Sequence, residues 1–299
     1  MSLLLIFLDG VGVGPAGPMN PLSHPGLRSF SLFTGCEGVD STSKEVINQE
    51  FLYKRLDANL SVEGLPQSGT GQTALFTGIN ASKVIGKHFG PYPHSALKPL
   101  LAEHSLFKKI QGKGKNPFFL NAYPDLFFKK SESLNRWSCT TLMTRSAGVP
   151  LNTITEVNKG EAITAEIVQS VWKNTLKLNV PEIEPEEASD RALNMLERYD
   201  LVLFEYYLTD KAGHSRQREM ADRVLHILDR FLFKIVSEIK KCDTLVITSD
   251  HGNIENMDVK THTRNPVPLF VKGDVSPFLN ATSITDITPS IAEVLGMGE

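Results

Sequence analysis

Six acidic and imidazole side chains in this sequence lie close to the ends of short apolar runs. They are Asp9, Asp210, His214, Asp250, His251 and His262. A mixture of carboxylate oxygens and imidazole nitrogens suits Mn, Zn or Fe better than Ca, which prefers oxygen alone. Any single one of them could equally be a turn residue, a helix cap or a solvated histidine. Because six occur together at such positions, the pattern favours a metal site.

The segment GLPQSGTGQTALFTGIN is rich in small and hydroxyl residues, so it could provide a nucleophile. Ser68, Thr70 and Thr73 all offer a hydroxyl that could act as a nucleophile. Ser68 could simply be the N-cap of the helix that follows, where it would accept hydrogen bonds from unpaired N–H groups. It could also carry a phosphoryl group, because a helix N-terminus stabilises an anion. The two interpretations are compatible.

Five apolar runs predict the strands that would position these residues. They are residues 3–8, 117–123, 201–208, 244–248 and 267–273. Apolar residues recur at three- and four-residue steps in 216–241, which predicts an amphipathic helix, and 184–200 predicts another. A closing helix is expected between Pro289 and Gly296. Strand–helix–strand order indicates an α/β fold with a parallel sheet, whose carboxyl edge collects ligand-binding residues. Asp210 and His214 are expected on a glycine-containing loop at that edge.

The middle of the chain, residues 124–180, differs from the rest. Its periodicity is weak, and it predicts one helix, at 161–174. We therefore expect a small insertion or lid at 124–180, on a core formed by residues 1–123 and 181–299.

Composition excludes several classes of function. The formal net charge is −3 and the pI is near 6.3, so no basic surface for nucleic acid is expected. The apolar start lacks a basic flank and predicts a buried strand, and no run is long enough to predict a membrane span. Three widely spaced cysteines fit a reducing compartment, so a cytoplasmic protein is expected. The oligomeric state is not indicated.

Taken in chain order, several motifs resemble the alkaline phosphatase superfamily of metalloenzymes, closest to its branch of cofactor-independent phosphoglycerate mutase and phosphopentomutase. The motifs are LIFLDGVG, QSGTGQTALFTG, LTDKAGH, SDHGN, HTRNPVP and the closing TDITPSIAEVLG. They span residues 3–90 and 200–297. The resemblance implies a three-layer αβα sandwich with a mainly parallel sheet, and the small lid would be inserted in it.

The resemblance also implies roles for the candidate residues. One divalent ion, Mn or Zn, would be held by Asp210, His214 and His262. The other would be held by Asp9, Asp250, His251 and the oxygen of Ser68. Ser68 would be the nucleophile that accepts the phosphoryl group of a small phosphate ester as phosphoserine. Transfer to water would make the protein a phosphatase or phosphodiesterase, transfer to a substrate hydroxyl would make it a phosphomutase, and the lid would decide by excluding water.

The middle region departs from the resemblance. Phosphoglycerate mutase of this type has a much larger insertion, with several arginines that bind its substrate, whereas residues 124–180 contain only Arg136 and Arg145. Activity of that mutase is therefore not expected. Substrate contacts are expected from Lys87, His88 and Asn121 instead.

Two alternative functions remain open. Sulfate-ester hydrolysis could use the same scaffold, but sulfatases place a modified cysteine in a C-x-P-S-R motif, and Ser68–Gln72 lacks its proline and arginine. The chain could also be a non-catalytic metal- or phosphate-binding protein. The complete set of ligand residues favours an enzyme.

Overall fold

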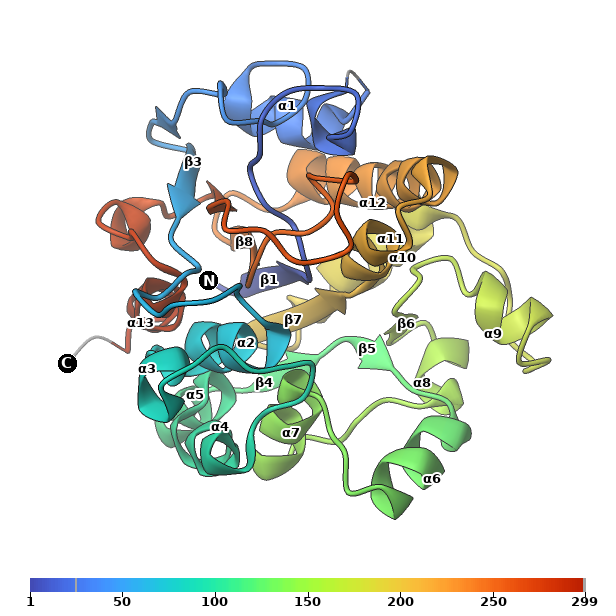
Figure 1. Cartoon of the computed structure of the whole chain (residues 1–299). Helices are drawn as coiled ribbons and strands as arrows, with labels where there is room; N and C mark the ends of the chain where they lie inside the picture. The colour runs from blue at the N-terminus through green and yellow to red at the C-terminus, as the bar shows by residue number, and fades with distance from the viewer. Residues whose placement is uncertain (25, 298–299) are drawn as a thin grey trace.

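A seven-stranded sheet lies between two layers of helices (Figure 1). The computed structural model describes residues 1–24 and 26–297. The strands follow one another across the sheet in the order β2-β3-β9-β8-β1-β7-β4. Their bounds are β1 Leu3–Leu8, β2 Val46–Ile47, β3 Phe51–Leu56, β4 Pro117–Phe119, β7 Leu201–Tyr206, β8 Thr244–Ser249 and β9 Val267–Lys272.

The centre of the sheet is parallel, as predicted. β1 pairs in parallel with β7 and β8, and β7 pairs in parallel with β4. The sheet is mainly and not wholly parallel, because β9 runs antiparallel to both β8 and β3. The connection from β8 to β9 consists of turns and loops, not a crossover helix, and so the chain reverses. The sequence pattern also did not predict β2 and β3.

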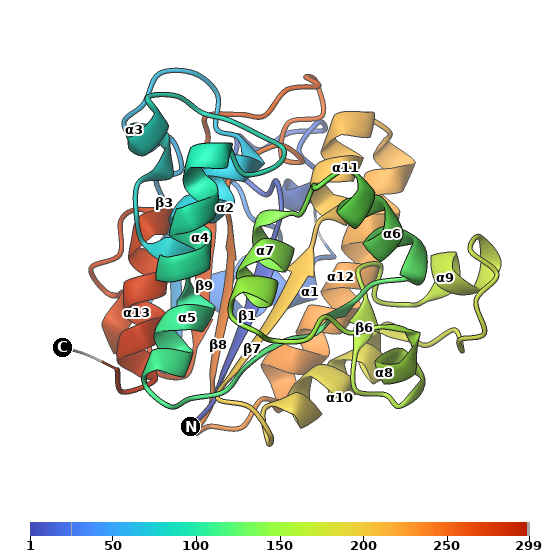
Figure 2. The ribbon, with the colours of Figure 1, turned by 90° about the horizontal axis from the view of Figure 1, so that it is seen from below.

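Helices cover both faces of the sheet (Figure 2). One face packs against α1 (Arg28–Thr34), α10 (Pro185–Met195) and α12 (Arg218–Glu238). The other packs against α2 (Ser68–Thr77), α4 (Lys98–His104), α5 (Leu106–Gly112), α7 (Cys139–Ser146) and α13 (Ile287–Val294). Alternate residues of β1 enter the two cores, Leu4 on one face and Leu5 on the other. The predicted αβα sandwich is confirmed.

The structure confirms the helices predicted at 184–200, at 216–241 and at the C-terminus, but two strand predictions change. The strand expected over 201–208 ends at Tyr206, because α11 (Leu208–Ser215) begins two residues later. The strand expected over 117–123 is divided into β4 and the separate β5 (Asn121–Ala122). None of the helices in the described residues has the length and apolar character needed to cross a membrane.

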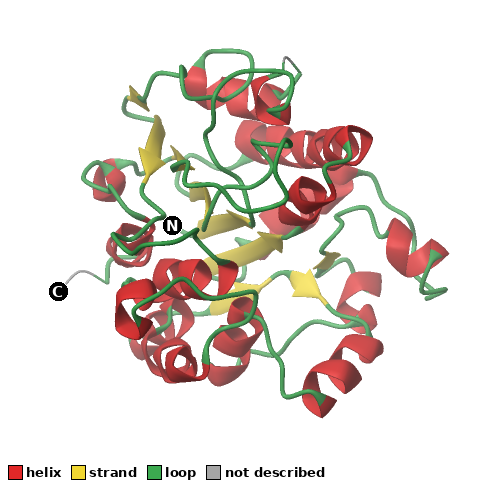
Figure 3. Cartoon of the chain, in the orientation of Figure 1, coloured by secondary structure: helices red, strands yellow, loops and turns green. Residues whose placement is uncertain are grey.

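The helix predicted over 161–174 is wrong. Ile163–Thr164 forms β6, which pairs with β5, and only Ser170–Asn174 is helical, as α9 (Figure 3). The backbone between them turns through positive φ at Ile167 and Gln169. The Glu166 carboxylate accepts hydrogen bonds from the N–H groups of Val171 and Trp172 in the first turn of α9. It therefore stabilises a helix that begins at Ser170.

The rest of segment 124–180 forms α6 (Asp125–Ser133), α7 and α8 (Ile154–Asn158). α7 packs against α2, α4 and α5 and so belongs to a core layer. The division into core and lid stays a prediction.

Candidate active site

The sheet places the candidate ligands at one edge. The last residues of β1 and β8 pair with each other, so Asp9 and Asp250 each come one residue beyond the ends of adjacent strands. Because β9 is antiparallel to β8, its first residue lies at the same edge, and His262 reaches the site just before it.

Asp210 and His214 lie on α11 and not on a loop, so that expectation is wrong. The helix begins almost directly after β7, and the Thr209 hydroxyl donates to the Asp9 carbonyl at 2.6 Å. Residues four apart share one helix face. The two side chains therefore meet, with Asp210 Oδ2 3.3 Å from His214 Nε2.

Asp9, Asp250 and His251 form the buried half-site. Their ligand atoms all lie within 4.8 Å of one another. His251 Nε2 is 3.3 Å from Asp9 Oδ1 and 3.5 Å from Asp250 Oδ2. Asp250 and His251 are fully buried. His251 Nε2 also lies 3.0 Å from Ser68 Oγ, so the serine hydroxyl completes this group.

Asp210, His214 and His262 form the open half-site. His262 Nε2 is 3.1 Å from His214 Nε2 and 3.5 Å from Asp210 Oδ1. The other ring nitrogens face backbone carbonyls, with His214 Nδ1 2.7 Å from Lys260 O and His262 Nδ1 2.7 Å from Pro66 O. Such contacts fix the orientation of a metal-binding imidazole.

The two half-sites adjoin one another. The rings of His251 and His262 stack with 3.8 Å between centroids. The ligand atoms of Asp210, His251 and His262 also lie within 4.8 Å of one another. All six predicted ligand residues and Ser68 therefore meet in a single cluster.

Ser68 is the first residue of α2, and Gln67 occupies the N-cap position. The expectation that Ser68 caps the helix is wrong, because its hydroxyl faces His251 instead. The helix approaches β8 closely at Gly71, where a Cβ would lie 2.8 Å from the Asp250 carbonyl oxygen. The hydroxyls of Thr70 and Thr73 donate to backbone carbonyls of the same segment, so only the Ser68 hydroxyl joins the cluster.

Burial and excess negative charge perturb the ionisation of the cluster. Burial raises the pKa of Asp9, and it raises that of Asp250 well above its ordinary range, with a further contribution from Asp9. Burial opposes protonation of His251, but the Asp250 and Asp9 carboxylates raise its pKa to about 10. Burial, with the neighbouring charge of His251, lowers the pKa of His262 to about 4.

These residues fit divalent cations. Within residues 1–24 and 26–297, the buried oxygens Asp9 Oδ1 and Asp250 Oδ2 accept no well-aligned hydrogen bond, and both share the single cationic neighbour His251. A buried carboxylate without a partner is costly, and a cation in the same place compensates its charge.

Three further side chains position the cluster, and the residue pattern alone did not single them out. Gln72 Nε2 donates to Asp9 Oδ2 at 3.2 Å, and Asn253 Nδ2 donates to Asp210 Oδ1 at 2.6 Å. Glu255 accepts from the backbone N–H of both Gly12 and Asn253. Their proximity in sequence to Ser68 and to Asp250-His251 was the available signal.

Glu255 joins the loops that carry the ligands. Besides its bonds to the loop after β1 and the loop after β8, it accepts from the Thr263 hydroxyl and from Asn265 Nδ2. Thr263 directly follows His262. A single buried carboxylate thus connects the segments bearing Asp9, Asp250 and His262.

A buried acid beside the cluster was also missed. Glu205, on β7, accepts a hydrogen bond of 2.6 Å from the Thr140 hydroxyl of α7. Burial, together with the charge of Asp9, raises the pKa of Glu205 to about 7. Glu205 was not singled out because it lies within an apolar run, which predicts only a buried strand.

The three predicted substrate contacts have other environments. Asn121 is buried. Its side-chain amide donates to the Glu205 carbonyl and accepts from the Glu205 N–H, so it satisfies the backbone of β7 beyond the end of β4. The His88 ring nitrogens face Ser82 Oγ and Val62 O. Lys87 is exposed. The expectation of substrate contact is therefore wrong for Asn121, whose polar atoms are occupied, and stays a prediction for Lys87 and His88.

Comparison with known proteins identifies a family for this chain. A family model described as Metalloenzyme superfamily matches residues 124–299. The 2,3-bisphosphoglycerate-independent phosphoglycerate mutase of Desulforudis audaxviator (strain MP104C) is 30% identical over 126 residues, which cover 39% of this chain and 25% of that protein. The chain thus aligns with a quarter of the length of the curated relatives that it matches.

Two solved structures share the fold over nearly the whole chain. The PH0037 protein from Pyrococcus horikoshii has a TM-score of 0.61 at 14% identity, covering 100% of this chain and 97% of that one. Cold-active alkaline phosphatase from Shewanella sp. has a TM-score of 0.58 at 13% identity, covering 99% and 100%. The family match covers more than half of the chain. The resemblance indicated by the motifs is confirmed: this chain belongs to the Metalloenzyme superfamily, whose mutases and phosphatases are metal-dependent enzymes of phosphate esters.

Proposed function

We propose that the chain transfers a phosphoryl group from a small phosphate ester to Ser68, and from there to water or to a hydroxyl of the substrate. The observation that carries this proposal is the position of Ser68 Oγ. It lies at the start of α2, 3.0 Å from His251 Nε2, among carboxylates with unsatisfied oxygens.

The ligand sets are proposed to hold two divalent ions, Mn or Zn. Asp210, His214 and His262 would hold one, and Asp9, Asp250, His251 and Ser68 Oγ the other. When bound, such ions lower the pKa of a coordinated hydroxyl and offset charge on the transferred phosphoryl group.

The residues of the chain would contribute orientation and electrostatics. His251 keeps the Ser68 oxygen at the edge of the cluster, and the N-terminus of α2 favours the negative charge of a phosphoserine. In the first step Ser68 Oγ loses its proton to solvent and bonds to phosphorus, while the ester oxygen leaves and takes up a proton from solvent. In the second step an oxygen of water or of the substrate loses its proton and bonds to phosphorus, and Ser68 Oγ is released and takes up a proton.

The inserted segment is proposed to decide between hydrolysis and internal transfer. It contains few arginines, so we expect no useful phosphoglycerate mutase activity, although the curated relatives carry that name. Robust turnover in a coupled assay for that mutase would contradict this expectation.

Hydrolysis of a chromogenic phosphate monoester and of the matching diester tests the proposal. Chelator-treated protein would be assayed after addition of Mn or Zn. Turnover should depend on metal and fall about 10³-fold or more in Ser68→Ala, which should keep its metal. Ser237→Ala, which removes an exposed serine hydroxyl of α12, is the matched control. Unchanged turnover in Ser68→Ala would reassign the nucleophile to Thr70 or Thr73.

A further inference from the structure

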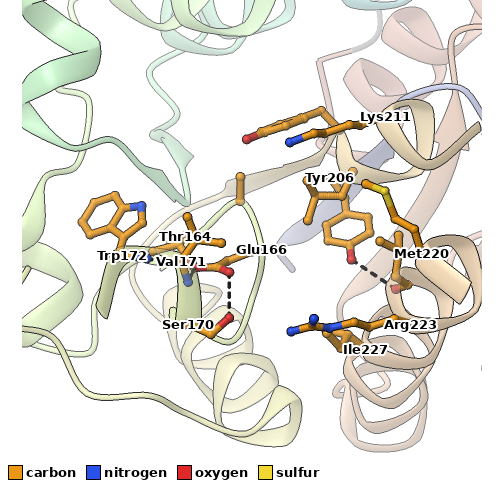
Figure 4. A pocket seen from close by; sticks show the side chains of 14 residues that line it. Thr164, Glu166, Ser170, Val171, Trp172, Tyr206, Lys211, Met220, Arg223 and Ile227 are labelled. Carbon is orange, nitrogen blue, oxygen red and sulfur yellow. Dashed lines mark hydrogen bonds between the residues drawn. The ribbon is translucent and has the colours of Figure 1, made fainter. Parts of the chain in front are cut away.

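A pocket of about 290 Å³ lies between the inserted segment and the core (Figure 4). Residues 164–166 and 170–172 line one side of it, and the end of β7 with α11 and α12 lines the other. None of its lining residues is a candidate metal ligand. The volume is close to the lower limit for small-molecule sites.

Two cationic side chains point into this pocket. Lys211 reaches it from α11, and Arg223 reaches it from α12 (Figure 4). Neither side chain forms an ion pair or hydrogen bond with another residue in the described part of the chain. Both are therefore available to bind an anion.

The single acid in the lining, Glu166, offsets only part of this positive charge. Glu166 accepts hydrogen bonds from Ser170 Oγ at 3.0 Å, from Val171 N at 2.5 Å and from Trp172 N at 3.3 Å. Its carboxylate is thus directed to the start of α9, and burial raises its pKa. The lining carries two cations and one acid, so the pocket favours an anion.

The remaining walls are apolar or aromatic. Val171 lies in the wall on the inserted side, and Met220 and Ile227 form the wall on α12 (Figure 4). The Trp172 ring packs instead into a small core with Val157 and Val180. Tyr206 is fully buried behind this wall, and its hydroxyl donates to the Val224 carbonyl. Such walls suit an aliphatic or aromatic body.

We propose that this pocket is a second ligand site, which binds a small organic anion whose charge is met by Lys211 and Arg223 and whose apolar body packs against Val171 and Met220. The anion has two possible sources: the organic part of the phosphate ester, or a separate effector. Binding of either anion would affect the candidate metal ligands, because α11 carries Asp210 and His214 as well as Lys211.

Calorimetric titration with naphthalene-2-sulfonate tests the site directly, without any need for turnover. The wild-type protein should bind one equivalent, and Lys211→Met combined with Arg223→Met should weaken binding about tenfold or more. Lys83→Met combined with Lys113→Met removes two exposed lysines away from the pocket and should leave binding unchanged. Neutral 2-naphthol should bind more weakly than the sulfonate.

Equal affinity of the two double variants for the sulfonate, or no binding by the wild-type protein at millimolar probe, would overturn the proposal. If the sulfonate raises KM for a chromogenic phosphate ester without changing kcat, the pocket takes the organic part of the substrate. If it binds there and changes kcat, or changes neither constant, the pocket takes a separate anion.

Discussion

The two half-sites use similar residue types but are constructed differently. In the buried half-site, Asp250 and His251 have no exposed side-chain surface and Asp9 has 11%. Strand ends position them, and two of their carboxylate oxygens accept no well-aligned hydrogen bond from the residues described. In the open half-site, the His214 side chain is 43% exposed, and backbone carbonyls fix both of its imidazoles.

This difference indicates which half-site should bind its metal ion more tightly. The buried half-site concentrates two carboxylates whose charge the chain offsets mainly through His251. In the open half-site His214 is partly exposed and both imidazoles are already oriented by backbone carbonyls. We therefore expect the buried half-site to bind its ion more tightly and to release it more slowly.

Replacement of Asp250 by Asn should give the largest effect. It removes a buried carboxylate of the buried half-site, so bound metal should fall by about one equivalent and turnover by about 10³-fold. In chelated protein the same change should increase the free energy of unfolding at pH 8, by roughly 1–3 kcal/mol, because a neutral amide replaces an acid whose charged form is disfavoured by burial and by Asp9. Urea unfolding with and without metal measures both effects.

Asp258→Asn changes an exposed loop acid and is the control. A chelated Asp250→Asn protein that is less stable than the wild type would contradict this expectation, because the contact of Asp250 with His251 would then outweigh the cost of burying the acid.

The next effect concerns Glu205 and pH. Its pKa rises from 4.5 to about 7 on folding, so the folded state binds the extra proton between these values. Stability of the chelated protein should therefore fall as pH rises from 4.5 to 7. Glu205→Gln should remove this loss, which is worth roughly 3 kcal/mol above pH 7. Unfolding free energies at pH 5 and pH 8 test it; parallel pH profiles for the two proteins would contradict the burial argument.

A smaller and more selective effect is expected from Asn253→Ala. The substitution removes the amide that donates to Asp210 Oδ1, so the open half-site should lose roughly 10- to 100-fold in metal affinity while the buried half-site keeps its own. Glu255→Gln should weaken both, because Glu255 joins loops of both half-sites. Metal titration by calorimetry separates these outcomes, and equal losses in both half-sites for Asn253→Ala would contradict the assignment.

The ligands could be predicted from sequence because their signals are local: a carboxylate or imidazole at the end of an apolar run has few other roles when several coincide. Long-range effects could not be predicted. The sequence does not show that Asn121 hydrogen-bonds the backbone of β7, 84 residues away, or that Thr140 faces Glu205.

Local propensity also failed where tertiary contacts override it. The pairing of Ile163 with Asn121 replaces the start of the predicted 161–174 helix, and α11 forms in a glycine-containing segment because it follows β7 directly. The pocket lined by residues 164–166 and 170–172 depends on such contacts, which is why the residue pattern did not indicate it.

The stoichiometry of bound metal tests the central claim most directly. Chelator-treated protein would be saturated with Mn or Zn, freed of excess ion and measured by elemental analysis. The wild-type chain should hold about two ions, and Asp9→Asn and His262→Ala should each hold about one. Two ions retained in both variants, or a single ion in the wild-type protein, would contradict a cluster made of two half-sites.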